Sequence, residues 1–304
     1  MAGVIETSGL TKRYGGVTAV CDLNLQVEAG QVFGFLGPNG AGKSTTIRML
    51  MALQRPTQGR VTLFGLDAAA DRVAVHRRVG YLPGDLELYP RLTGRQHIDW
   101  FARSRGSVDD SSTQRLLERF AVVADRPVRE LSKGNRQKIG LVLAFMHKPE
   151  LLVLDEPTSG LDPLMQHEFE NLLRETAGEG RTVFLSSHEL DEVQRIADRI
   201  AIIRDGRLVA EDTVEGLRRA APQKMEVWFA RPVDPAGLRA LAGVTVTAVD
   251  GPRLALDVTG EIGPVLRLIA GNDPIDMTCR PADLEELFLD FYRHPQEKAV
   301  SHAD

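Results

Sequence analysis

The chain has 304 residues, enough for one large domain and a smaller one. Hydrophobic residues make up 43% and charged residues 26%, which excludes a mainly disordered protein. The formal net charge of −5 argues against a protein that coats nucleic acid, so no nucleic-acid partner is expected. The two cysteines, Cys21 and Cys279, lie far apart and indicate neither a disulfide framework nor a zinc site, which fits a reducing cytoplasm.

The sequence contains no predicted membrane span. No stretch approaches the roughly 18 consecutive apolar residues that a transmembrane helix needs. The first residues also lack the basic segment and apolar run of a signal peptide. If the protein acts at a membrane, we expect another polypeptide to supply the span.

The first part of the chain predicts a β-hairpin. Residues 4–14 and 18–27 have strand composition and flank the turn pair Gly15-Gly16. Tyr14 lies at the end of the first strand, where its ring could stack on a purine or pack across the hairpin. Its position alone does not decide between these two interpretations.

A phosphate-binding loop follows. Residues 31–36 predict a buried strand, and residues 45–53 predict a helix. The segment between them fits G-x-x-x-x-G-K-[ST], and this flanking order disfavours a chance glycine-rich turn. Glycines let successive N–H groups converge on phosphates, Lys43 would reach the β- and γ-phosphates, and Ser44 would ligate Mg²⁺. The residues of the loop are Gly37, Pro38, Asn39, Gly40, Ala41, Gly42, Lys43, Ser44 and Thr45.

The middle of the chain is predicted to be mainly helical. A strand at 60–64 and a segment at 79–82 precede a break at Pro83-Gly84-Asp85. Thr93 and Gln96 have the spacing of a capping box, which predicts a helix to about residue 104, with Trp100 and Phe101 in its core. A second helix is predicted over 112–120.

A second glycine-containing signature introduces the next helix. Residues 131–135 read L-S-K-G-N and lead into an apolar helix at 139–147. Serine and glycine at a helix start can build an anion site. An ordinary serine N-cap is the alternative.

Paired carboxylates end the next predicted strand. Residues 151–154 are apolar and deliver Asp155 and Glu156 to the edge where parallel sheets place their ligands. Asp155 is suited to hold Mg²⁺, and Glu156 to accept a proton from an attacking water. A helix at 163–177, with proline in its first turn, leads to a third buried strand at 181–187. His188 lies at the end of that strand, where it could contact a γ-phosphate.

The pattern changes after residue 220. Strands at 224–229, 244–249, 253–258 and 275–280 alternate with helices at 235–241 and 262–270, and the order β-α-β-β-α-β resembles a ferredoxin-like sandwich. A last amphipathic helix is predicted over 283–292. We therefore expect two domains, 1–220 and 221–304.

Together these motifs resemble the nucleotide-binding subunits of ATP-binding cassette (ABC) transporters, over roughly residues 4–220. The resemblance implies an α/β phosphate-loop ATPase with a RecA-like core, an antiparallel β subdomain and a helical subdomain at about 84–148. The remainder would form a small α+β C-terminal domain. ATP and Mg²⁺ are the implied cofactors.

The resemblance also implies residue roles. Tyr14 would stack on adenine, Asp155 would assist Mg²⁺ binding, Glu156 would activate water, and His188 would sense the γ-phosphate. The loop over 159–162 would cross to a second copy, and the signature would complete the opposing site, so that two chains sandwich two ATP molecules head to tail. The residues implied in those contacts are Ser132, Lys133, Gly134, Asn135 and Asp162.

Two departures from the family pattern are evident. A glutamine normally follows the strand at 79–82, but Gly84 and Asp85 stand there, and Asp85 and Glu87 are possible substitutes. The signature reads LSKGN where LSGGQ is commoner, so Lys133 and Asn135 are expected to alter activity without abolishing it.

These departures resemble the drug-export subclass. That subclass implies a homodimeric ATPase at the cytoplasmic face of the membrane, which drives a separate permease for drugs, antibiotics or similar amphiphiles. A soluble ABC-type ATPase acting on ribosomes or DNA is the alternative. The candidate permease dock could equally be buried within the helical subdomain, and it comprises Leu86, Leu88, Tyr89, Leu92 and the helix after Thr93.

Overall fold

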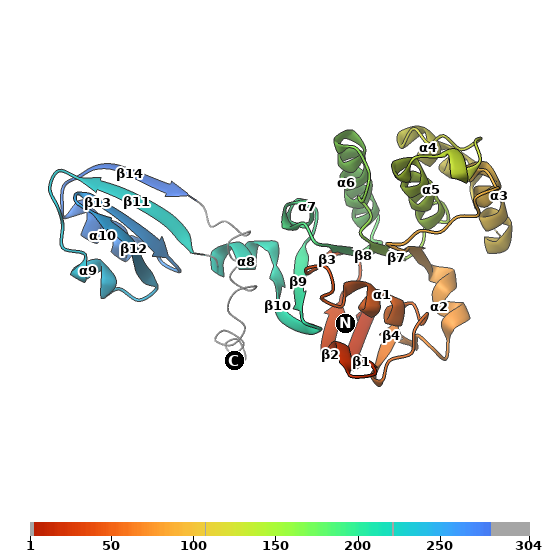
Figure 1. Ribbon diagram of the computed structural model, residues 1–304, viewed down its shortest axis with the longest axis horizontal. Coiled ribbons are helices and arrows are strands. Elements are labelled where there is room, and N and C mark those ends of the chain that lie inside the picture. Colours follow the sequence, from red (N-terminus) through yellow and green to blue (C-terminus); the bar gives the residue numbers. More distant parts are fainter. Residues whose placement is uncertain (1–2, 107, 221, 281–304) are drawn as a thin grey trace. The chain divides into compact units, whose positions relative to one another are not determined.

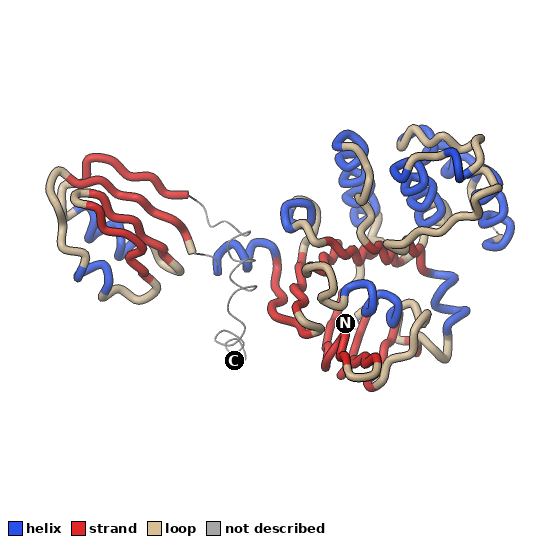
Figure 2. The backbone as a smooth tube through the Cα atoms, viewed as in Figure 1, coloured by secondary structure: helices blue, strands red, loops and turns tan. Residues whose placement is uncertain are grey.

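The computed structural model describes residues 3–106, 108–220 and 222–280 (Figures 1 and 2). The helix expected at 283–292 lies outside the described residues. The chain divides into two compact units between Glu211 and Asp212. Helix α8 (Val214–Ala220) falls in the second unit, and the domain boundary after residue 220 stays a prediction.

A six-stranded sheet forms the centre of the first unit. Its order is β10-β9-β3-β8-β7-β6, and β9, β3, β8, β7 and β6 pair in parallel. Strands β3, β7 and β8 are buried along their whole length, which explains their nearly continuous apolar sequences. The strands are β3 (Val32–Leu36), β6 (Val79–Leu82), β7 (Leu151–Asp155), β8 (Thr182–Ser187), β9 (Arg199–Arg204) and β10 (Arg207–Thr213).

An antiparallel sheet lies on one side of this core. Its order is β2-β1-β4-β5, and the predicted hairpin is its β1–β2 pair. Helix α1 (Lys43–Leu50) lies between the two sheets, where it contacts β7 and β4 and buries Ile47 and Leu50 (Figure 1). The strands are β1 (Ile5–Tyr14), β2 (Val17–Val27), β4 (Gln58–Leu63) and β5 (Leu66–Asp67).

Helices cover the opposite side of the central sheet (Figure 1). The predicted capping box is present: Thr93 Oγ1 accepts the Gln96 N–H at 3.1 Å, and Gln96 Oε1 accepts the Thr93 N–H at 2.8 Å. These helices are α3 (Gly94–Arg105), α4 (Asp110–Arg119), η1 (Val128–Glu130), α5 (Lys133–Phe145), α6 (Pro163–Gly178) and α7 (Leu190–Gln194). Helix α2 (Arg72–Arg78) contacts β6 and lies on the same side of the central sheet as α1 (Figure 1).

The expectation that Trp100 lies in the core of α3 is wrong. The buried face of that helix carries Gly94, His97 and Ile98, so Trp100 faces solvent with 61% of its surface exposed. Phe101 is half-buried and contacts the Trp100 ring edge to face.

The second unit has the predicted ferredoxin-like order. Its antiparallel sheet runs β12-β13-β11-β14, with one helix after the first strand and one after the third. Side chains of β11 and β13 alternate between buried and partly exposed, so one face forms a small core. The elements are β11 (Gln223–Phe229), α9 (Ala236–Arg239), β12 (Val244–Asp250), β13 (Arg253–Val258), α10 (Gly263–Ala270) and β14 (Pro274–Arg280).

Candidate active site

The loop between β3 and α1 depends on its glycines. Gly40 has φ +82° and Gly42 φ +110°, values that side chains other than glycine rarely adopt. A Cβ on Gly37 would lie 2.4 Å from the carbonyl oxygen of Ile203. Helix α1 begins at Lys43 without a side-chain cap, so its first N–H groups point toward the loop as an anion site.

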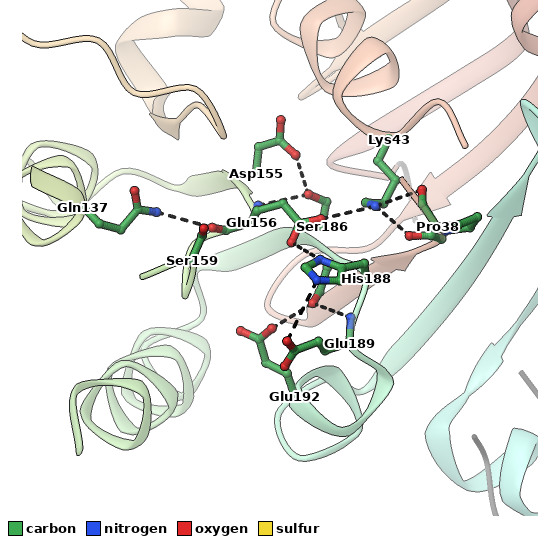
Figure 3. Close-up of polar contacts among 12 residues, drawn as sticks. Pro38, Lys43, Gln137, Asp155, Glu156, Ser159, Ser186, His188, Glu189 and Glu192 are labelled. Atoms are coloured by element: carbon green, nitrogen blue, oxygen red, sulfur yellow. Dashed lines mark hydrogen bonds and ion pairs between the residues drawn. The ribbon is translucent and has the colours of Figure 1, made fainter. Parts of the chain in front are cut away.

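The ammonium group of Lys43 is held inside this loop. The side chain is only 5% exposed, and Nζ donates to the carbonyls of Gly37 at 2.6 Å and Pro38 at 3.2 Å. The same nitrogen lies 3.2 Å from Glu156 Oε1 (Figure 3). Among the other loop residues, Asn39 is exposed, Ala41 is buried, and Ser44 and Thr45 are half-buried in the first turn of α1.

Glu156 joins Lys43 to His188. Its second carboxylate oxygen, Oε2, lies 2.7 Å from His188 Nδ1, which donates because an ionised carboxylate only accepts (Figure 3). The carboxylate is 23% exposed and the imidazole 48%, so solvent reaches both groups. Lys43, Glu156 and His188 therefore form one row across the ends of α1, β7 and β8.

Asp155 is the buried member of the acidic pair. Its side chain is 4% exposed, and Oδ1 accepts a hydrogen bond from Ser186 Oγ at 2.6 Å. No lysine, arginine or histidine among the described residues forms an ion pair with it. A buried carboxylate without a cationic partner fits Mg²⁺, which typically takes one or two carboxylates, waters and substrate phosphates. Burial, followed by the charge of Asp155, raises the pKa of nearby Tyr81 to about 12.

The segment after β6 places a glycine beside Asp155. A Cβ added to Gly84 would lie 3.1 Å from Asp155 Oδ2. Asp85 is exposed and pairs with Arg48, at 3.6 Å between Oδ2 and Nη2, and Glu87 lines a groove of about 590 Å³. Gly84, the residue next to the Asp155 carboxylate, thus carries no side chain. Asp85 and Glu87, the substitutes suggested by the sequence, lie next to other groups.

The signature turn caps α5. Ser132 Oγ accepts the N–H of Asn135 at 3.2 Å. The Asn135 amide is already occupied within the chain, because it accepts the N–H of Val123 at 2.8 Å and donates to the Val123 carbonyl at 2.9 Å. Asn135 therefore fixes the Val123 backbone, while Ser132 and Lys133 are exposed.

The start of α5 also packs on the loop that follows Glu156. Lys133 Nζ donates to Ser159 Oγ at 2.9 Å, and a Cβ on Gly134 would lie 2.4 Å from the carbonyl oxygen of Gly160. That loop ends at Asp162, whose Oδ1 accepts the N–H of Met165 at 3.0 Å and caps α6.

Tyr14 lies at the tip of the β1–β2 hairpin. It pairs with Val17, and the hairpin approaches the phosphate loop at Ala19, whose carbonyl oxygen would lie 2.5 Å from a Cβ on Gly42. The Tyr14 ring is 47% exposed, with Lys12 Nζ 5.2 Å from its centroid and its hydroxyl bonded to the Gln54 amide. A half-exposed ring on this hairpin is compatible with stacking on a base.

Sequence reasoning missed three buried polar groups around Glu156: Gln137, Ser186 and Glu192. Gln137 Nε2 donates to the carbonyl of Pro157 at 2.9 Å, and Ser187 Oγ donates to Glu192 Oε2 at 2.8 Å (Figure 3). Burial raises the pKa of Glu192. For Gln137 the available signal was a polar residue near the start of an apolar helix, and for Ser186 a polar residue within an apolar strand.

This arrangement defines a class of protein. A parallel sheet brings a phosphate loop, a buried aspartate, a glutamate and a histidine to one edge, where nucleotides bind in such folds. The fold and the site are those of a phosphate-loop nucleotide hydrolase.

Comparison with known proteins narrows this class. The ABC transporter family model matches residues 20–159. The bacitracin transport ATP-binding protein BcrA of Enterococcus faecalis is 39% identical over 222 residues, which cover 72% of each chain. The daunorubicin resistance ATP-binding protein DrrA3 of Streptomyces coeruleorubidus is 36% identical over 303 residues, 94% of each chain. A solved ATP-binding subunit of an ABC transporter superposes with TM-score 0.66 at 31% identity, covering 71% of this chain and 92% of that one.

The chain belongs to the ATP-binding proteins of the ABC transporter family. It is an ATPase, and the resemblance seen in its motifs is confirmed. In the described part of the chain, no helix has the length and apolarity to cross a membrane.

Proposed function

We propose that this chain is the ATP-hydrolysing subunit of an exporter, in which two copies close on ATP and drive a separate membrane permease. BcrA is named for bacitracin transport and DrrA3 for daunorubicin resistance, which supports drugs, antibiotics or similar amphiphiles as the cargo class. The protein would then sit at the cytoplasmic face of the membrane, bound to its permease.

The observation that carries the hydrolytic role is the row of Lys43, Glu156 and His188 beside the phosphate loop. Glu156 would take one proton from water as the water oxygen attacks the γ-phosphorus, and the bond to the ADP oxygen would break. Lys43 would stabilise negative charge on the β- and γ-phosphates. Its present bond to Glu156 would then be exchanged for a bond to phosphate, leaving the carboxylate free to accept the proton.

Ser44 and Asp155 would hold Mg²⁺, whose charge would neutralise the phosphate oxygens during transfer. His188 donates to Glu156 through Nδ1 and so holds the carboxylate in place. Because His188 lies between β8 and α7, a contact of its side chain with the γ-phosphate would be transmitted to both elements.

The exposed start of α5 supports a two-chain site. Ser132 and Lys133 face solvent at a helix N-terminus, where they would contact the nucleotide on a second copy. Asn135 would contribute indirectly, because its amide is engaged with Val123. Asp162 would set the direction of the crossing loop by capping α6.

The permease dock would lie on the loop before α3. Tyr89 is 68% exposed, Leu92 37% and Trp100 61%, and Tyr89 lines the groove of about 590 Å³ together with Arg129 and Arg136. Leu86 and Leu88 are half-buried, so they would shape the groove from beneath.

Glu156→Gln tests the hydrolytic assignment. We expect this variant to bind ATP, accumulate as a closed dimer in size-exclusion chromatography, and hydrolyse ATP at least about 100-fold more slowly, because the proton acceptor is lost. Glu179→Gln makes the same substitution at an exposed glutamate and serves as the control. Unchanged turnover in Glu156→Gln would refute the assignment.

A second experiment tests the exporter role. The tagged chain is recovered from its native cell after gentle solubilisation of the membranes. A multi-spanning protein in the eluate supports the proposal. A cytosolic protein that elutes with ribosomes or DNA would favour the soluble ATPase alternative.

A further inference from the structure

We infer that Gln137 is a positioning residue for hydrolysis: from the second turn of α5, it holds the backbone that carries Glu156 in its own chain. This inference rests on the proposed role of Glu156 as the proton acceptor. It concerns a buried side chain that takes no part in the chemistry described above.

The backbone of Glu156 has an unusual conformation. Its φ is +49°, in the left-handed region that residues other than glycine adopt at an energetic cost. Such a conformation persists only where neighbouring groups hold it, and it aims the carboxylate at Lys43 and His188. The groups that hold this backbone are therefore part of how the carboxylate is placed.

Hydrogen bonds hold both sides of this residue. The Glu156 N–H lies 3.2 Å from both the carbonyl oxygen and Oγ of Ser186. On the other side, Gln137 Nε2 donates to the carbonyl of Pro157 at 2.9 Å and lies 3.4 Å from the carbonyl of Glu156 (Figure 3). Gln137 thus bonds the two carbonyls that follow the left-handed turn.

This contact requires the Gln137 side-chain amide to be buried, which costs free energy unless the amide is hydrogen-bonded. Gln137 is 5% exposed, and the inward positions that follow it along α5 are apolar. A buried amide is tolerated where it is hydrogen-bonded, and the two carbonyls supply acceptors. A methionine would fill the same space without donating.

Other contacts make α5 and the loop one packed unit. Lys133 bonds Ser159, and Gly134 fits against Gly160 with no room for a Cβ. The first turn of α5 therefore contacts Ser159 and Gly160 near the end of the loop. The second turn, through Gln137, bonds the start of the loop at Glu156 and Pro157. In the proposed dimer, the same helix would touch the partner's nucleotide and fix its own catalytic carboxylate.

The first test is Gln137→Met in the purified full-length protein. We expect kcat to fall by about tenfold or more, because a small displacement of the carboxylate weakens proton transfer. ATP affinity should change little, since the phosphate loop is untouched. Gln114→Met on α4, where the glutamine is exposed and bonds Glu118, is the matched control and should behave as wild type. A loss confined to KM, or no loss, would overturn the inference.

Mixed dimers separate a role in the same chain from a general role in α5. The reference dimer pairs Glu156→Gln with a wild-type chain, so that one site remains active. In the first mixed dimer, one chain carries Gln137→Met and its partner carries Glu156→Gln. In the second, one chain carries both changes and its partner is wild type. Two different affinity tags isolate each pair.

We expect the first mixed dimer to lose about tenfold in turnover relative to the reference, and the second to match the reference. Equal losses in both, or a loss in the second alone, would overturn the inference, because Gln137 would then act through folding or through the signature. If the Glu156→Gln homodimer hydrolyses normally, the proposed function itself fails. If the reference dimer is inactive, the kcat and KM of Gln137→Met alone decide the inference.

Discussion

Gly134→Ala tests the close packing between the signature turn and the loop after Glu156. The added Cβ would lie 2.4 Å from the carbonyl oxygen of Gly160, whereas contacts under 3.0 Å are essentially never seen for real Cβ atoms. The backbone must therefore open by at least about 0.6 Å, and because the oxygen belongs to the main chain, no side-chain rotation can relieve the clash. Overpacking of this kind costs about 1–3 kcal/mol.

We expect Gly134→Ala to lower Tm by several degrees and to lower ATP turnover by a larger factor than its stability loss explains. Thermal unfolding and phosphate release measure the two effects. Gly178→Ala is the matched control, since this residue ends α6 with no atom within 4 Å of the added Cβ, and its Tm should stay the same or rise. A Gly134→Ala protein with wild-type Tm and turnover would refute the packing described here.

Two further predictions concern histidines, of which His97 is buried and His147 half-buried. Burial, followed by the charge of Arg105, lowers the pKa of His147 from 6.5 to about 4. The unfolded chain therefore takes up a proton as pH falls below 6.5 while the folded chain does not, and stability should decline by at most about 1.4 kcal/mol per pH unit until pH 4. His147→Leu should flatten this slope in urea titrations between pH 4.5 and 7.5, and an unchanged slope would contradict the assignment. His97 bonds the Thr93 carbonyl at 2.7 Å through Nδ1 and accepts the Tyr89 N–H at 3.0 Å through Nε2, so His97→Leu should loosen the loop before α3. We expect the yield of co-purified permease to fall several-fold while ATP hydrolysis in solution persists; equal recovery would argue against a dock at this loop.

The parts of the site that could be predicted from sequence share one property. The phosphate loop, Asp155, Glu156 and His188 each stand at the end of a buried apolar strand, and parallel strands bring their carboxyl ends to one edge. Local pattern and sheet geometry together were therefore enough to gather these residues. The order of elements in the second unit could be predicted from the succession of strand and helix patterns along that part of the chain.

The parts that could not be predicted depend on contacts between distant segments. Asn135 reads as a candidate nucleotide contact, but its amide meets Val123, which no spacing rule indicates. In the sequence, Gln137 is a single polar residue next to a predicted apolar helix. Only the fold shows that its side chain bonds the Pro157 carbonyl. Helix α2 was not predicted, although Asp71 at its N-cap is a residue type typical of that position; in the structure the Asp71 side chain makes no capping bond.

The place of β3 in its sheet affects how the site forms during synthesis. This strand carries the phosphate loop, yet its two neighbours are β8 and β9, which lie far along the chain. A ribosome that has completed residues 32–45 must add most of the first unit before either neighbour leaves the exit tunnel, an interval on the order of ten seconds. Until then the apolar β3 has no sheet partner, so a nascent chain stalled before β8 would present it to chaperones, without a nucleotide pocket.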